Sequence, residues 1–89
     1  MTSESKRYQV LVKKTAEKTI DSLPSKIRER IIFAIDSLGY EPRPDGCKKM
    51  TLGTRYRIRV GEYRVIYEIE DAVLVVLVVR VGHRKDVYR

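Results

Sequence analysis

The spacing of hydrophobic residues changes twice along this chain, from two residues to three or four and back to two. Residues 7–13 alternate in character, which predicts a first strand with one more polar face. Its two faces would carry Tyr8, Val10 and Val12 on one side and Gln9, Leu11 and Lys13 on the other.

Two helices are predicted next. The stretch from Lys14 to Leu23 places its apolar residues, Ala16, Ile20 and Leu23, on one side. Pro24 is tolerated in a first helical turn, so it predicts the opening of a second helix. Gly39 then stands where a helix C-terminus favours a left-handed residue. The second helix has one apolar stripe, formed by Ile27, Ile31, Ala34, Ile35 and Leu38.

The second half of the chain predicts a sheet. Residues 40–54 contain Pro42, Pro44, Gly46 and Gly53 without a sustained period, which indicates a surface loop. Arg55–Val60 and Tyr63–Ile69 alternate like strands, and Gly61–Glu62 between them suits a type II′ turn. After a turn at Glu70–Asp71, Val73–Val79 is typical of a central strand buried on both faces. We expect this strand to end at Gly82, before a short tail of residues 83–89.

Length and composition limit the possibilities. With 89 residues and 43% hydrophobic content, the chain can close one modest core, so residues 1–89 are expected to form a single domain. Nineteen Lys and Arg against twelve Asp and Glu give a net charge of +7, which favours nucleic acid, an acidic protein or an anionic membrane surface as partner.

Other function classes are disfavoured. The single cysteine, Cys47, excludes an internal disulfide and cannot assemble a cysteine metal site, which fits a reducing compartment. Neither a metal nor a cofactor is expected for this chain. Residues 1–6 lack the apolar core of a secretory signal, and the apolar run of residues 72–79 is far shorter than the ~20 residues that span a bilayer. A soluble, cytoplasmic protein without a membrane partner is expected.

The predicted hairpin separates two kinds of side chain. A two-residue turn pairs Val60 with Tyr63 and places Arg59 directly opposite Arg64. One face is then apolar and suited to cover the helices, with Tyr56, Ile58, Val60, Tyr63, Val65, Tyr67 and Ile69. The other face carries Arg55, Arg57, Arg59 and Arg64, interrupted only by Ile66 and Glu68.

Clustered arginines on one sheet face oppose folding unless an anion or a carboxylate such as Glu68, Glu62 or Asp86 relieves their repulsion. Guanidinium groups make forked contacts with phosphate oxygens, so the face predicts a phosphodiester site. The alternative is an exposed face where arginine gives solubility and protects an edge strand. Cations are also dense before the hairpin, because residues 43–59 hold six basic side chains against one acidic.

The C-terminal segment adds Arg80, Arg84 and Tyr88. A tyrosine among arginines is a common way to stack a nucleic acid base while the cations hold the backbone. Tyr88 is equally consistent with covering the edge of the core.

These residues resemble the RelE/ParE toxin superfamily, and more closely its RelE branch. The hairpin segment is shared across the superfamily, whereas the Gly-His-Arg and Val-Tyr tail is more typical of RelE. The similar segments cover most of the chain in order: Leu23–Pro24 leading into Ile27–Ile31, then Tyr56–Tyr67, and Val81–Tyr88. The resemblance implies an α+β fold, with two N-terminal helices packed on a small antiparallel sheet. The C-terminal helix of some relatives is not expected, since the sequence stops at Arg89.

The resemblance also implies an activity: a toxin of a type II toxin–antitoxin system that enters the ribosomal A site and cleaves mRNA. The 2′-hydroxyl attacks the adjacent phosphate without a metal, and cationic side chains stabilise the transition state. By matching position, Arg64 would hold the scissile phosphate, Arg84 would stabilise the transition state or protonate the leaving oxygen, and Tyr88 would orient the nucleotide. The expected partners are a RelB-like antitoxin, the ribosome and mRNA.

Arg57 and Arg59 complete the expected catalytic set, at positions where relatives carry lysines. Arginine stays protonated and is a poor base, so the proton acceptor is left open. His83 is a candidate because it titrates near neutrality, with a structural role at the strand end as the alternative. Flanking cations are expected to bind RNA: Lys48, Lys49, Arg55, Arg80 and Lys85.

Two other functions compete with cleavage. A ParE-like protein would inhibit DNA gyrase without cutting RNA, although Arg84 and Tyr88 argue against that branch. A degenerate relative would act only as an antitoxin-bound regulatory module. In every case the antitoxin is expected to be acidic where it covers the arginine face.

Overall fold

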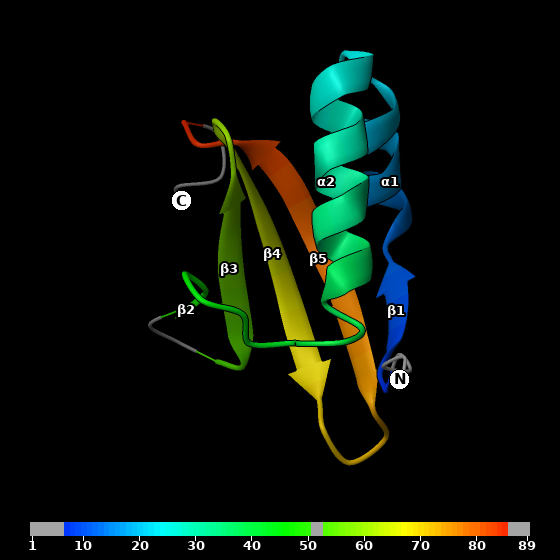
Figure 1. The fold of residues 1–89 in the computed structure, drawn as a ribbon, viewed down its shortest axis with the longest axis vertical. Helices are drawn as coiled ribbons and strands as arrows, with labels where there is room; N and C mark the ends of the chain where they lie inside the picture. Colours follow the sequence, from blue (N-terminus) through cyan, green and yellow to red (C-terminus); the bar gives the residue numbers. More distant parts are fainter. Residues whose placement is uncertain (1–6, 51–52, 86–89) are drawn as a thin grey trace, which may run out of the picture.

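The computed structural model describes residues 7–50 and 53–85 as two helices on a five-stranded sheet (Figure 1). The α+β class expected from the sequence is therefore confirmed. In chain order the elements are β1 (Gln9–Val12), α1 (Lys14–Asp21), α2 (Ser25–Ser37), β2 (Lys48–Lys49), β3 (Arg55–Val60), β4 (Tyr63–Glu70) and β5 (Val75–His83).

The strands lie in the order β1-β5-β4-β3-β2. Three of the four strand pairs are antiparallel, as expected, whereas β1 pairs with β5 in parallel, with Gln9 opposite Val75. This pair departs from the antiparallel sheet of the sequence prediction. It is possible because both helices and three strands separate β1 from β5, and parallel neighbours need such a long connection.

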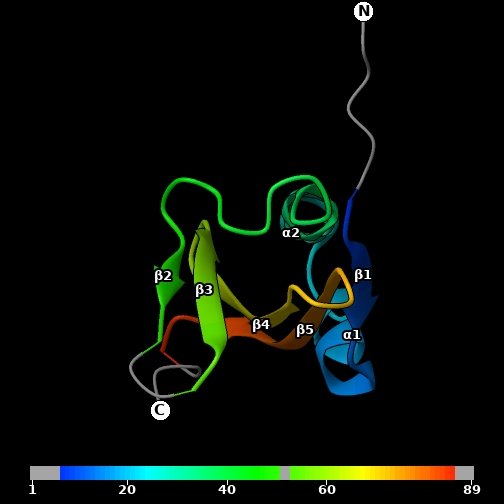
Figure 2. The same cartoon turned by 90° about the horizontal axis from the view of Figure 1, so that it is seen from below.

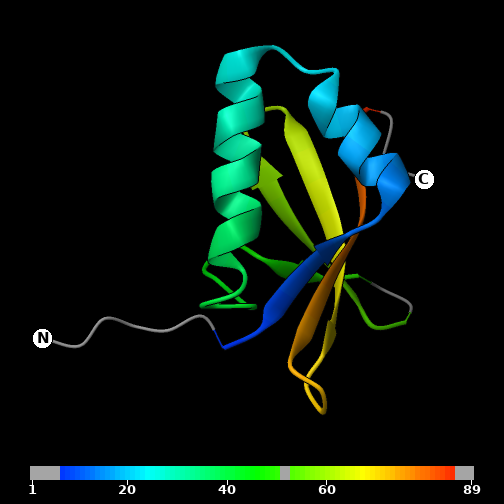
Figure 3. The same ribbon diagram turned by 90° about the vertical axis from the view of Figure 1, so that its right-hand side faces the viewer.

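Both helices contribute to one core against one face of the sheet. Figure 2 shows the strands in a curved layer with α2 on its concave side, and Figure 3 shows α1 beside the end of β5. Ala16 and Ile20 of α1 and Ile31 and Ile35 of α2 are buried, as the predicted stripes require. The buried sheet residues of this core are Ile58, Val60, Val65, Tyr67, Ile69, Val76, Val78 and Val81.

The helix ends differ from the prediction at Gly39. This glycine is not among the described residues with positive φ, so the expected left-handed C-terminus is wrong. Gly39 is buried instead, and its carbonyl accepts hydrogen bonds from the backbone N–H groups of Arg7 and Tyr8, each at 3.0 Å. The end of α2 thus binds the backbone of Arg7 and Tyr8, the two residues before β1.

Two strand boundaries also differ. The expected loop of residues 40–54 contains β2, where Lys48 pairs with Arg57. β5 begins later than predicted and continues through Gly82 to His83, because β4 offers partners along that whole length.

The β3–β4 hairpin has the predicted register. Val60 pairs with Tyr63 and Arg59 with Arg64. Gly61 has φ of 60°, and Glu62 is not among the residues with positive φ, which fits the predicted type II′ turn rather than type I′. The apolar hairpin face lies in the core and the arginine face lies on the opposite side, so the separation of faces is confirmed.

A small apolar cluster lies on the face away from the helices. Ile66 and Val79 are buried there, with Met50 and Leu77 packed against them. Ile66 pairs with Arg80 while Tyr67 pairs with Val78, so β5 carries one extra residue at this point. Such a bulge re-aims side chains. Here the bulge lies beside the buried pair Ile66 and Val79, which form an apolar centre within the cationic face.

A polar network joins the loop after α2 to β1, β3 and the β4–β5 turn. Arg43 binds Asp71 through Nη2 and Oδ2 at 2.9 Å, and its Nε donates to the Tyr56 hydroxyl at 3.2 Å. The Tyr8 hydroxyl donates to Asp71 at 2.6 Å, which links β1 to the β4–β5 turn. The buried Tyr67 hydroxyl donates to the Pro42 carbonyl at 2.7 Å. These bonds hold the loop after α2 across the end of the sheet.

Candidate nucleic acid site

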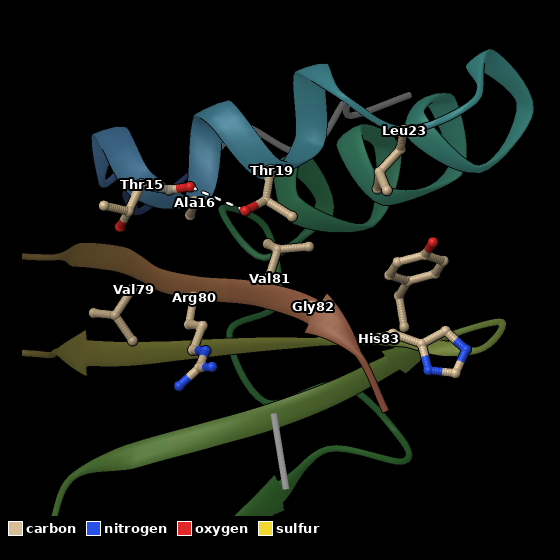
Figure 4. Close-up of a pocket in the computed structure, with 10 residues that line it drawn as sticks. Thr15, Ala16, Thr19, Leu23, Val79, Arg80, Val81, Gly82 and His83 are labelled. Carbon is tan, nitrogen blue, oxygen red and sulfur yellow. Dashed lines mark hydrogen bonds between the residues drawn. The ribbon is translucent and has the colours of Figure 1, made fainter. Parts of the chain in front are cut away.

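A line of residues crosses four strands on the face away from the helices. Residues paired across neighbouring strands share a face, so the pairing of Lys48, Arg57, Ile66 and Arg80 places three cations around a buried apolar centre. Lys48 and Arg80 are exposed and Arg57 is half-buried. Figure 4 shows Arg80 directed away from α1, whereas Val81 points toward it.

A cavity of about 290 Å³ lies at the hairpin end of the same face. Of the expected site residues, the structure brings Arg59, Arg64, Arg84 and Lys85 together around it, with Gly61, Glu62 and Tyr63 completing the lining. We call this the arginine cavity. Four cationic side chains around one small space favour the approach of an anion.

Arg64 and Arg59 reach this cavity in different ways. Arg64 is only 5% exposed and its Nε atom is buried, whereas Arg59 is exposed. The difference arises because Arg64 lies on the inner strand of the hairpin, with β3 on one side and β5 on the other. A buried guanidinium has a fixed direction, which suits a group that must hold a phosphate in one place.

Glu62 is the acidic residue of the cavity lining. Its Oε1 lies 3.2 Å from Arg84 Nε and 3.7 Å from His83 Nε2. Its backbone carbonyl accepts a hydrogen bond from the Arg84 N–H at 2.8 Å. The turn of the hairpin is thus joined to the end of β5 by both backbone and side chain. The sequence suggested Glu62 as a relief for arginine repulsion, and the structure gives it that geometry.

His83 does not line the arginine cavity. It lines a neighbouring groove of about 450 Å³ between α1 and β5, together with Thr19, Leu23 and Tyr63 (Figure 4). Its ring meets Tyr63 edge to face at 5.5 Å, and its Nδ1 accepts a hydrogen bond from the Lys85 N–H at 3.3 Å. These contacts fit the structural alternative. No pattern in the sequence indicates this groove, because it depends on how α1 packs against β5.

The other site residues expected from the sequence either lie away from the arginine cavity or fall outside the residues that the structure describes. Arg55 lies at the far end of β3, where its Nε binds Glu68 Oε2 at 3.0 Å. Lys49 pairs with Tyr56, so it faces the helix side of the sheet and not the arginine side. Tyr88, with Asp86, lies outside the described residues.

Across residues 7–50 and 53–85, no three His, Cys, Asp or Glu side chains gather as metal ligands would. None of the helices described there is long and apolar enough to cross a membrane. The arginine cavity offers clustered positive charge, with Arg64 buried and Arg59, Arg84 and Lys85 exposed.

Comparisons with known proteins identify the family. The sequence matches the family described as the ParE toxin of type II toxin–antitoxin systems over residues 8–88. It is 35% identical over 85 residues to toxin RelG of Mycobacterium tuberculosis, covering 92% of this chain and 97% of RelG.

Solved structures are similar too. The archaeal RelE–RelB complex of Pyrococcus horikoshii contains a chain with TM-score 0.81 and 30% identity, covering 90% of this chain and 98% of that one. The RelBE2 toxin–antitoxin complex of Mycobacterium tuberculosis gives TM-score 0.75 and 32% identity, covering 90% and 94%. These matches show that the chain belongs to the RelE/ParE superfamily of toxins of type II toxin–antitoxin systems.

Proposed function

We propose that this toxin is an endoribonuclease that cuts mRNA in the ribosomal A site. The observation that carries the proposal is the convergence of Arg59, Arg64 and Arg84 on one cavity. Cleavage by the neighbouring 2′-hydroxyl needs no metal: the phosphate must be held, the negative charge that develops on it must be stabilised, and the 2′-hydroxyl proton must pass to a base, for which solvent water is available. A cationic cavity at the end of the β3–β4 hairpin supplies the first two.

Each arginine has a role that fits its surroundings. The buried Arg64 holds the scissile phosphate, because its guanidinium direction is fixed by the strands on both sides. The exposed Arg84 stabilises the pentavalent transition state or delivers a proton to the leaving 5′-oxygen. Arg59 adds positive charge from the facing strand, and Tyr88 is proposed to orient the nucleotide.

The rest of the cationic face is proposed to hold the RNA backbone. Lys48, Arg57 and Arg80 cross the sheet in one line, and Lys85 lies in the arginine cavity itself. Arg57 is thereby placed beside the cavity and not in its lining. Contacts of this kind position RNA without reading its sequence. Sequence preference would then come from the base that stacks near the cavity.

A RelB-like antitoxin is the proposed protein partner, and the cytoplasm, where ribosomes are met, is the proposed location. The Pyrococcus horikoshii and Mycobacterium tuberculosis relatives were both solved as toxin–antitoxin complexes. With a net charge of +7 on this chain, an acidic antitoxin segment that covers the arginine cavity would block RNA entry and bind rapidly.

The test is toe-printing of a defined mRNA on programmed ribosomes with and without the purified protein. We expect cleavage at A-site codons and almost none of the same RNA free in solution. Arg64→Ala and Arg84→Ala should abolish cutting while circular dichroism shows a retained fold. Lys18→Ala, on the exposed side of α1, is the control of equal charge change and should cut normally. Full activity in both arginine variants would refute the mechanism.

The alternative is inhibition of DNA gyrase. It is favoured by one observation, the match to the family described by its ParE toxin. A supercoiling assay with the same preparation separates the two functions. Gyrase inhibition together with intact mRNA on ribosomes would replace the nuclease assignment.

A further inference from the structure

We propose that Glu62 is a positioning residue that holds Arg84 in the arginine cavity. This inference rests on the proposed nuclease function and adds to it an acidic residue of the hairpin turn. Glu62 holds Arg84 at two points, because its carbonyl binds the Arg84 N–H at 2.8 Å and its carboxylate binds Arg84 Nε at 3.2 Å. One residue therefore fixes both the backbone and the side chain of Arg84.

The two contacts support each other. An isolated ion pair between exposed side chains contributes little, since ordering two long side chains opposes the attraction. Glu62 and Arg84 are 64% and 58% exposed, so their pair alone would be weak. The backbone bond already brings the two residues together, which reduces the conformational freedom that the ion pair must remove. The result is a local clamp between the β3–β4 turn and the end of β5.

Repulsion makes such a clamp necessary. Arg59, Arg64, Arg84 and Lys85 share one cavity, and like charges in one place push the most mobile side chain outward. Arg84 is exposed and follows the last residue of β5, so the sheet holds it less firmly than Arg59 and Arg64, which lie within paired strands. Glu62 contacts Arg84 through Nε. A contact at Nε does not require the two terminal Nη groups, which a phosphate can then engage.

The same contact could have the opposite role, in which the Glu62 carboxylate competes with the substrate phosphate for Arg84. If Glu62 only occupied the place of the substrate phosphate, its removal would improve RNA binding and speed cleavage. A positioning role predicts a lower kcat with KM unchanged or lowered, since removing a negative charge does not weaken attraction to RNA. The sign of the change in kcat therefore separates the two roles.

The experiment compares Glu62→Ala, Glu62→Asp and Glu70→Ala in the full chain, on programmed ribosomes. We expect Glu62→Ala to lower kcat about tenfold, as for a misplaced catalytic group. Glu62→Asp keeps the carboxylate and should recover part of the loss. Glu70→Ala removes the same charge from the exposed far end of β4 and is expected to cut like the wild type.

A second background tests whether Glu62 acts through Arg84. Arg84→Lys keeps the charge but lacks the Nε group that Glu62 contacts. In that background, Glu62→Ala should change kcat by less than about twofold, because the partner it positions is gone. Equal loss in both backgrounds, a higher kcat, or an unchanged kcat in Glu62→Ala would each overturn the proposal. A wild-type protein that cuts no mRNA would instead refute the nuclease function.

Discussion

Arg59 and Arg64 face each other across the β3–β4 hairpin, and the structure exposes one and buries the other. Their substitution by lysine should therefore have different effects. Arg64→Lys keeps the charge but loses the forked geometry at a buried position, so we expect cleavage to fall about 10- to 100-fold. Arg59→Lys should stay close to the wild-type rate, because Arg59 is exposed and supplies charge more than direction.

Single-turnover cleavage on programmed ribosomes measures both variants. Melting curves should show that the Arg64→Lys protein is folded under the assay conditions. Equal losses at the two positions would mean that burial of Arg64 has no catalytic consequence.

Asp71 predicts how stability depends on pH. The Arg43 guanidinium, and after it the Tyr8 hydroxyl, lower the pKa of the Asp71 carboxyl below its ordinary value of 3.8. Near that pH the unfolded chain binds more protons than the folded one, so the contribution of Asp71 is present above pH 3.8 and is lost as pH falls through the lower folded pKa. Asp71→Asn should thus destabilise the protein at neutral pH and have a shrinking effect in acid.

Urea unfolding between about pH 7 and pH 3 measures the difference between the two proteins. The Arg43→Ala background is the control, since it removes the first cause of the pKa shift. A difference that is constant across this range would show that the network contributes no pH dependence.

At the scale of elements, the β3–β4 turn carries a backbone requirement. Gly61 has φ of 60°, where an L-residue is strained, and an added Cβ would lie 3.4 Å from Arg30 Nη1. Gly61→Ala should lower the free energy of unfolding by about 1–2 kcal/mol. It should also slow cleavage, because Glu62 lies in this turn and Arg64 is the second residue of β4 after it. Val73→Ala, at the exposed β4–β5 turn and without positive φ, is the matched control and should be nearly neutral.

The β3–β4 hairpin was also the element that the sequence predicted best, because its determinants are close together in the sequence. Its register depends on a two-residue turn and on alternation within 16 residues, all of which are local. The parallel partner of β1, the short β2 and the far end of β5 depend on residues distant in sequence, so periodicity alone did not indicate them. Gly39 shows the same limit, since its carbonyl serves the approach to β1 and not a left-handed helix end.

The features of the candidate site also divide into those that local strand alternation predicts and those that depend on long-range packing. The shared face of Arg57, Arg59 and Arg64 followed from strand alternation. The near-complete burial of Arg64 did not, because it results from β5 packing beside β4. Nor did the clamp between Glu62 and Arg84, which joins a turn to a strand end 22 positions later. Composition predicted that cations would dominate the site, and only the fold showed which of them meet.

At the scale of the whole molecule, the cationic groups differ in where they lie. Lys48 extends the row of Arg57 and Arg80 on the sheet face, whereas Lys18 lies on α1, which packs on the opposite side. If RNA lies along the sheet face, Lys48 displaces counterions from the RNA when it binds and Lys18 does not. Affinity for a single-stranded RNA oligomer should fall with salt, and Lys48→Ala should reduce that slope by about 0.7, the value for one phosphate contact.

Lys18→Ala changes the net charge by the same amount and should leave the slope unchanged while shifting affinity slightly at low salt. Fluorescence anisotropy over a series of salt concentrations measures the slope for each variant, with the noncleaving Arg84→Ala substitution present in all of them so that the RNA stays intact. Because the two lysines differ only in their place on the fold, equal slopes would mean that RNA senses the overall charge of the molecule. A smaller slope for Lys48→Ala alone would locate the RNA path on the sheet face that leads to the arginine cavity.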